Sequence, residues 1–165
     1  DTNNFANSVF PSTLRMASAL LEAGVDRDAI VEGLFNSYRI NRLRLLGQLL
    51  GSSLRTTPEG AAFIVLTRQA KESFDIRDGE TEGFVNIPLS VKDIRLSILA
   101  SEEEDRFRVS VRSKKGISAR GLAEGYFHGG GHVNASGGRI LIPQDIPDAA
   151  SAEAYILNAI KEYFR

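Results

Sequence analysis

Three adjacent glycines followed at once by a histidine, Gly129, Gly130, Gly131 and His132, form the stretch whose residue types best suit chemistry. Glycines lose much backbone entropy on folding, so a run of them indicates a positive φ or a backbone that something approaches closely. Consecutive amides can form a nest for an anion, and a following helix N-terminus would add about half a positive charge. The stretch predicts a phosphate cradle with an imidazole at its rim; a flexible loop with an incidental histidine is the alternative.

A basic stripe on a predicted strand is the second candidate. Between residues 106 and 114, apolar residues alternate with polar ones, so period-two geometry places the two kinds on opposite faces. The polar positions are Arg106, Arg108, Ser110, Arg112 and Lys114. A solvated face is the ordinary explanation, but the strand ends a short helix before the glycines. Arg112 can bind phosphate bidentately and Lys114 can add a point charge, at about 1.5 to 3 kcal/mol per charged hydrogen bond.

The elements that must position these residues begin with helices. Apolar residues at helical spacing predict helices over 11–24, after Asp26 and over 41–54. A group of arginines along them, Arg39, Arg42 and Arg44, could line a cleft for an anionic substrate or form an exposed basic face. Turn residues at 56–60 mark a lobe boundary. We therefore predict two parts, residues 1–55 and residues 56–165.

The second part is expected to hold a sheet. Apolar runs and alternating patterns predict strands over 61–67, 94–100, 106–112 and 138–142. Helices are expected over 117–125 and after Asp148. Periodicity leaves 68–74 as a short helix or a loop, and 78–89 as a short helix or a strand.

Composition bounds the class of protein. The chain has 165 residues, 42% hydrophobic and 25% charged, with a formal net charge of −1. These values are typical of a globular chain, and a polyanionic ligand must be attracted by a local patch. The chain has no cysteine, which fits a cytoplasmic location, and no run of the roughly 20 apolar residues that a membrane span needs. Because it begins with Asp1, we expect a piece of a longer protein.

The glycine stretch carries a family resemblance. GGGHVNASG at 129–137 resembles the Gly-Gly-Gly-His-x-x-Ala-Ala-Gly signature of the DHHA1 domain, the C-terminal half of DHH phosphoesterases, with Ser136 replacing an alanine. DTNNF at 1–5 is similar to the Asp-Thr-Gly-x-Phe motif that closes the DHH domain, with Asn3 at the glycine position. Asparagine tolerates left-handed backbone better than most residues. The segment 78–89 resembles one in the oligoribonuclease-like branch of the family.

The resemblance implies a fold and an activity. It implies an α/β chain in which a helical linker leads into a DHHA1-type lobe with a mixed sheet and flanking helices. Family members hydrolyse phosphoesters with two manganese ions, and members of this branch act on short oligoribonucleotides and on 3′-phosphoadenosine-5′-phosphate. Two ions can activate a water and neutralise charge at phosphorus. The chain lacks most of those ligands, so no catalytic residue is assigned and the fragment alone is expected to be inactive.

The resemblance also implies roles for particular residues. Asp1 is similar to a metal ligand of the missing domain. The phosphate-binding roles fall on Arg112, Lys114, Gly130, Gly131 and His132. The expected partners are short RNA oligonucleotides or phosphorylated nucleotides and no membrane, and a homodimer stays open.

Several other activities share these motifs. A RecJ-like single-strand exonuclease, a cyclic-dinucleotide phosphodiesterase and an exopolyphosphatase are alternatives within the family. A stand-alone DHHA1 nucleic-acid-binding module without catalysis is the alternative of a different class. The Asp1-Thr2 remnant argues against that module, which needs no metal motif.

Overall fold

The computed structural model describes Phe5 and residues 9–165, in two compact units that divide between Arg39 and Ile40. Unit 1 holds two helices, α1 (Pro11–Glu22) and α2 (Arg27–Phe35). The predicted start of α2 is confirmed, because the Asp26 carboxylate accepts a hydrogen bond from the Ala29 N–H at 2.9 Å. Neither helix contains a buried residue in the described part of the chain, so the apolar faces predicted for them are exposed.

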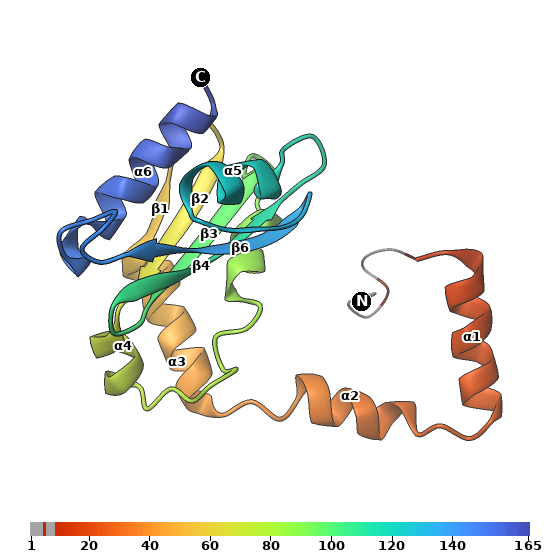
Figure 1. Ribbon diagram of the computed structural model, residues 1–165. Coiled ribbons are helices and arrows are strands. Elements are labelled where there is room, and N and C mark those ends of the chain that lie inside the picture. Colours follow the sequence, from red (N-terminus) through yellow and green to blue (C-terminus); the bar gives the residue numbers. More distant parts are fainter. Residues whose placement is uncertain (1–4, 6–8) are drawn as a thin grey trace. The chain divides into compact units, whose positions relative to one another are not determined.

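The described strands of unit 2 form one six-stranded sheet in the order β1-β2-β3-β4-β6-β5 (Figure 1). The strands are β1 (Leu54–Thr56), β2 (Ala61–Leu66), β3 (Leu96–Glu102), β4 (Arg106–Ser113), β5 (Gly130–His132) and β6 (Ala135–Leu141). β2 and β3 run parallel, and the other neighbouring strands run antiparallel. The mixed α/β fold expected from the sequence is confirmed.

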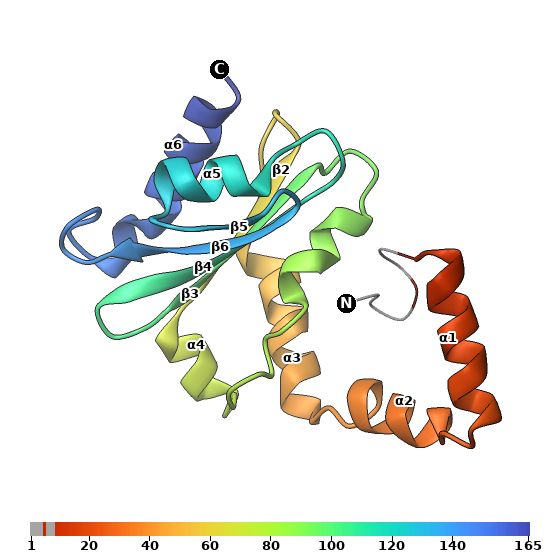
Figure 2. The same cartoon turned by 45° about the vertical axis from the view of Figure 1, so that its right-hand side comes forward.

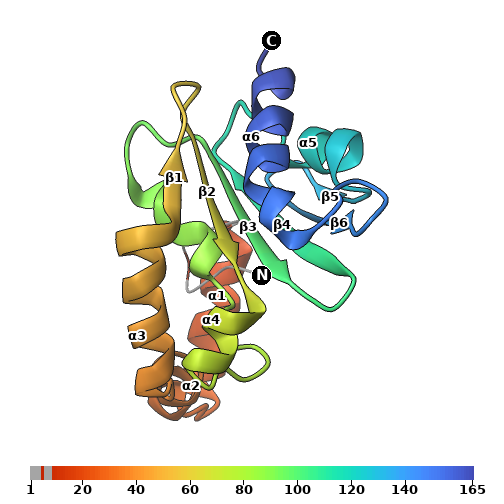
Figure 3. The same ribbon diagram turned by 90° about the vertical axis from the view of Figure 1, so that its left-hand side faces the viewer.

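Helices cover both sides of this sheet. Figure 3 shows α3 on one side of the strands, with α5 and α6 on the other. The helical elements of unit 2 are α3 (Ile40–Gln48), a π-helical turn (Leu49–Ser53), α4 (Arg68–Ser73), a 3-10 segment (Phe84–Ser90), α5 (Ala119–Tyr126), a 3-10 turn (Ala149–Ser151) and α6 (Ala152–Tyr163). The parallel pair β2–β3 requires a crossover, and residues 67–95 supply it with α4 and the 3-10 segment. No helix among the described residues has the length and apolar character needed to span a membrane.

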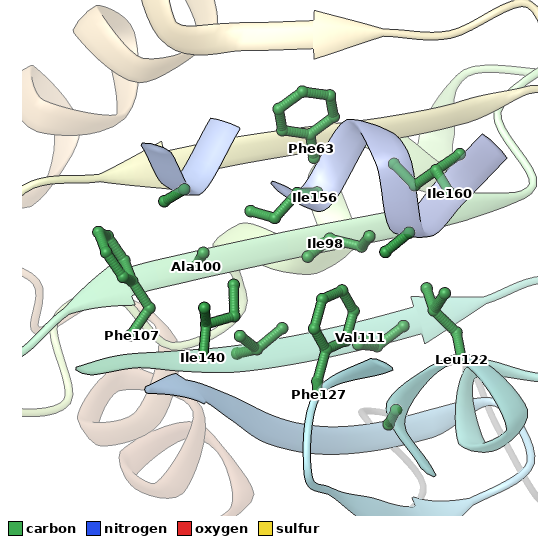
Figure 4. Packing of buried hydrophobic residues seen from close by; sticks show 14 of the residues in the cluster. Phe63, Ile98, Ala100, Phe107, Val111, Leu122, Phe127, Ile140, Ile156 and Ile160 are labelled. Atoms are coloured by element: carbon green, nitrogen blue, oxygen red, sulfur yellow. The ribbon is translucent and has the colours of Figure 1, made fainter. Parts of the chain in front are cut away.

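One side of the sheet, which we call the closed face, is sealed by α5 and α6. Phe107, Val109 and Val111 point into this layer and are almost completely buried, as the alternation along β4 predicted. They pack against residues of the two helices, including Leu122 and Ile156 (Figure 4). This layer is the larger hydrophobic core of unit 2.

The opposite side is covered over only part of its width. Leu45 and Leu49 pack with Phe84 on Ile64 and Leu99, so this smaller core lies over β2 and β3. The neighbouring strands β4 and β6 carry polar and small residues on this side. We call this surface the open face, and it consists of Arg108, Ser110, Arg112, Ala135, Gly137 and Arg139.

The structure divides the chain at a different place from the lobe boundary predicted between 55 and 56. Because Leu45 and Leu49 are buried in unit 2, α3 belongs with the sheet. The break at 56–60 lies inside the sheet as the turn between β1 and β2, where the Gly60 N–H donates to the Thr57 carbonyl at 3.1 Å.

Candidate phosphate-binding site

Arg112 and His132 lie in one row across three neighbouring strands. The pairing places Arg112 opposite Ala135, and Ala135 opposite His132. Directly paired residues of antiparallel strands present their side chains on the same side, so both side chains belong to the open face. Strands lie about 4.8 Å apart, which sets the two backbone positions roughly 10 Å apart. Side chains of this length can approach one anion from two sides.

The glycine run forms a strand and is followed by another strand, so the helix expected after it is wrong, while its role as a phosphate cradle stays a prediction. Gly130 and Gly131 belong to β5, which pairs with β6 at the edge of the sheet (Figure 2). A two-residue turn between His132 and Ala135 leads back into β6. Because β5 is outermost, one row of its backbone N–H groups faces away from β6, and an anion can still reach it there.

Close packing of neighbouring backbone explains the glycines at this edge. A Cβ atom at Gly129 would lie 2.0 Å from the Gly137 carbonyl oxygen, and one at Gly138 would lie 2.2 Å from the Phe127 carbonyl oxygen. Gly131 has a φ of 138°, which side-chain-bearing residues rarely adopt. Gly129, Gly131 and Gly138 are therefore required by the fold, whatever the glycine run binds.

The guanidinium of Arg112 is held from one side. Its Nη1 donates to the Val111 carbonyl at 2.9 Å and to the Ser136 carbonyl at 3.2 Å. Within the described part of the chain, the side chain has no carboxylate at ion-pair distance, and it is half-buried. A fixed guanidinium with its charge unneutralised is well suited to bind a phosphate.

Lys114 is placed differently from Arg112. Its Nζ donates to the Val91 carbonyl at 2.6 Å and to the Lys92 carbonyl at 3.1 Å. The ammonium thus ties the end of the crossover to the end of β4. Two of its donors are used in this way, so its predicted role as a direct phosphate ligand stays a prediction.

A hollow of about 380 Å³ lies beside Arg112 on the open face. Its lining, which defines the Arg112 hollow, includes Glu82, Gly83, Val85, Leu99, Arg108 and Arg112. The wall at 82–85 comes from the crossover. Arg42, predicted to line a cleft, instead holds this wall: its guanidinium donates to the Glu80 and Glu82 carbonyls at 2.6 and 3.0 Å and lies 4.4 Å from the centre of the Phe84 ring.

A second hollow, of about 410 Å³, adjoins the first and shares Arg108 with it. Its lining, which defines the Arg139 hollow, includes Glu103, Arg106, Arg108, His128, Gly129 and Arg139. The Glu103 carboxylate lies 2.7 Å from the Arg106 Nε and 3.7 Å from the Arg108 Nε, and its hydrogen bond raises the pKa of the Arg106 guanidinium. Glu103 therefore neutralises part of the charge at this end.

His128, predicted as a capping or exposed residue, pairs with a carboxylate at the rim of the Arg139 hollow. Its Nε2 lies 2.9 Å and 3.0 Å from the two carboxylate oxygens of Asp145. Burial alone would raise the pKa of the Asp145 carboxyl, but hydrogen bonds from His128 and from the Leu141 N–H outweigh it and lower that pKa. Asp145 thus joins the turn before β5 to the end of β6.

The predicted metal ligand, Asp1, lies outside the described residues. Within Phe5 and 9–165, no group of three or more histidine, cysteine, aspartate or glutamate side chains could hold a metal ion. The described residues therefore do not fit the two manganese ions that the family resemblance implies. The geometry of this chain supports binding of an anion, and no chemical step is derived through a metal.

Sequence reasoning missed two contributors to the open face. Arg139 lies opposite Arg108 in the β4–β6 pairing, which a lone strand pattern cannot show. The crossover wall at Gly83 and Val85 was also missed as part of a site. The basic stripe of β4 was the only signal for this surface in the sequence. It marks one face of the sheet, and residues of β6 that pair with the stripe lie on that same face.

Comparisons with known proteins agree with this fold. The family model described as "DHHA1 domain" matches residues 60–163. The chain is 31% identical over 165 residues to the bifunctional oligoribonuclease and PAP phosphatase NrnA of Thermus thermophilus, covering 98% of this chain and 47% of that protein. It is 30% identical over 144 residues to the protein of the same name from Bacillus subtilis, covering 85% and 44%.

A solved structure resembles nearly the whole chain. The crystal structure of an exopolyphosphatase-related protein from Bacteroides fragilis superposes with a TM-score of 0.88 at 34% identity, covering 99% of this chain and 47% of that one. The chain thus spans about half the length of these relatives.

Proposed function

Since the chain belongs to the DHHA1 family, we propose that it is the substrate-binding part of a phosphoesterase that hydrolyses short oligoribonucleotides and 3′-phosphoadenosine-5′-phosphate. Two relatives are named for those activities, and the chain matches 44% and 47% of their lengths. The observation that carries the proposal is the row that sets Arg112 and His132 on one open face of the sheet. A nucleotide phosphate is the anion that this row would bind.

Each residue of the row has a distinct part in this proposal. Arg112 supplies the guanidinium N–H groups that its two carbonyl contacts leave free. Because successive N–H groups of a strand point to opposite sides, one N–H of the pair Gly130 and Gly131 faces outward from the edge strand and is offered to the anion, and His132 covers the anion from the far side. Lys114 adds positive charge and holds the end of the crossover in place at Val91 and Lys92. Hydrolysis itself, with two manganese ions, would belong to residues of the longer protein.

The binding role can be tested with adenosine 5′-monophosphate and this 165-residue chain. We expect Arg112→Ala to weaken binding about tenfold or more, because a charge-assisted hydrogen bond contributes about 1.5 to 3 kcal/mol. Isothermal titration calorimetry measures the change. The matched control is Arg165→Ala, which removes the same charge at the end of α6, where Arg165 pairs only with Glu162 among the described carboxylates.

The control should bind like the parent chain. Equal affinity of Arg112→Ala and parent, with both proteins folded by circular dichroism, would exclude Arg112 as the phosphate ligand.

A further inference from the structure

The open face carries cations at two separate levels along β4. Arg112 lies near one end of the strand, and Arg108 lies four residues away on the same face. At about 3.4 Å per residue, the two backbone positions are roughly 14 Å apart. Arg139 pairs directly with Arg108, so the second level holds two arginines side by side. A single phosphate in the hollow beside Arg112 borders Arg108 as well, but Arg139 lines only the other hollow.

Small residues separate the two levels. The row between them consists of Ser110, Gly137 and Gly130 in direct pairing across β4, β6 and β5. None of these side chains rises far from the sheet, so the floor between the cationic levels is low. Leu99 and Val85 border it on the side of the crossover. The Arg112 hollow reaches Ser110 of this row, the Arg139 hollow reaches Gly137, and Arg108 lines both.

The arginines around the second level differ in how far nearby carboxylates neutralise them. Arg106 is paired with Glu103 at 2.7 Å, and Arg108 lies 3.7 Å from the same carboxylate. Glu103 thus serves two arginines, and Asp145 is occupied by His128. In the part of the chain that the structure describes, the Arg139 guanidinium has neither an ion pair nor a hydrogen bond, and the side chain is exposed. The level keeps an excess of positive charge, with Arg139 free to bind.

We propose that the Arg139 hollow is a second anion subsite, which binds an inner phosphate of an oligonucleotide whose terminal phosphate lies at Arg112. This inference rests on the proposed function and adds the ligand's length to it. A stacked strand advances about 3.4 Å per nucleotide, so roughly 14 Å corresponds to about four stacked nucleotides, and to fewer when the strand is stretched. A mononucleotide fills the first level alone, whereas a tetranucleotide with a stretched backbone reaches both.

The proposal predicts that Arg139 discriminates ligands by length. We expect Arg139→Ser to weaken binding of a 5′-phosphorylated adenosine tetranucleotide about tenfold, the cost of one charge-assisted phosphate contact, and to leave adenosine 5′-monophosphate within twofold of the parent chain. The slope of log affinity against log salt for the tetranucleotide should fall by about 0.7 for the lost contact. Titration calorimetry of this chain without added divalent ions measures both ligands at several salt concentrations.

Two control variants separate this inference from the proposed function. Arg112→Ala should weaken both ligands, and Arg165→Ser, just beyond α6, should weaken neither. Equal loss for both ligands in Arg139→Ser would make Arg139 part of the first site and overturn the second subsite. No loss for either ligand in Arg139→Ser, while Arg112→Ala remains defective, would overturn the second subsite and keep the proposed function. No loss in Arg112→Ala would count against the proposed function itself.

Discussion

The two faces of the sheet differ in what covers them, although the same strands form both. On the closed face, Phe107, Val109 and Val111 are shielded by α5 and α6. On the open face, the intervening residues Arg108 and Arg112 border hollows, one of which the 3-10 segment also lines through Val85. One strand thus supplies stability through one set of side chains, and in the proposed function it supplies binding through the other. The two properties can be changed separately, residue by residue.

Substitutions on the two faces should differ most in their effect on the free energy of unfolding at neighbouring positions of β4. Phe107→Ala should lower the free energy of unfolding by about 3 to 5 kcal/mol, because it leaves a cavity in the main core where Phe107 is fully buried. Arg108→Ser, one residue along and mostly exposed, should stay within about 0.5 kcal/mol of the parent. Urea unfolding followed by circular dichroism measures both. Similar losses in the two variants would show that the open face also supports the fold.

A smaller effect is expected at the neighbouring glycines of β6. Gly138 faces the closed side, and a Cβ there would lie 2.2 Å from the Phe127 carbonyl oxygen, so Gly138→Ala should cost about 2 to 3 kcal/mol. At Gly137, on the open side, the nearest atom to an added Cβ is the Val109 carbonyl oxygen at 3.2 Å. Gly137→Ala should therefore lose less than about 1 kcal/mol. Thermal unfolding compares the pair, and the reverse order would contradict the assigned faces.

The smallest effect concerns the rim, where Asp145 pairs with His128. The pKa of Asp145 is lower in the folded chain than in an unfolded one, so its carboxylate stabilises the fold above the ordinary carboxyl pKa. That contribution is lost as the pH falls through the lower folded value. Asp145→Asn should cost about 1 kcal/mol at neutral pH and less in acid. Unfolding measured from pH 7 down to acid tests this, and a constant difference between variant and parent would refute the linkage.

Local patterns predicted the two faces well. The alternation along β4 is a property of one strand, so the sequence alone placed Val109 inward and Arg108 outward. The continuous apolar run of β2 likewise indicated a strand buried on both sides, and Asp26 starts a helix as residues of its type commonly do. These features depend on neighbours within a few residues.

Features that depend on pairing between distant segments were not predictable in this way. Arg139 joins the open face only through the register with β4. Lys114 has the chemistry of a phosphate ligand, but carbonyls of the crossover occupy two of its donors. The glycines signalled a special backbone without saying whether a ligand or the Phe127 carbonyl required it. Helix α3 looked like part of a linker because its buried partners, such as Ile64, lie further along the chain.

The crossover between β2 and β3 is a segment in which related proteins can differ without changing the sheet. It joins the parallel pair, and its residues Gly83 and Val85 also border the hollow beside Arg112. Surface connections accept insertions and deletions far more readily than paired strands do. An insertion or deletion at 74–83 would change the shape of the hollow beside Arg112 while leaving the strand register intact. The range of ligands that fit the hollow would then change while the sheet stays the same.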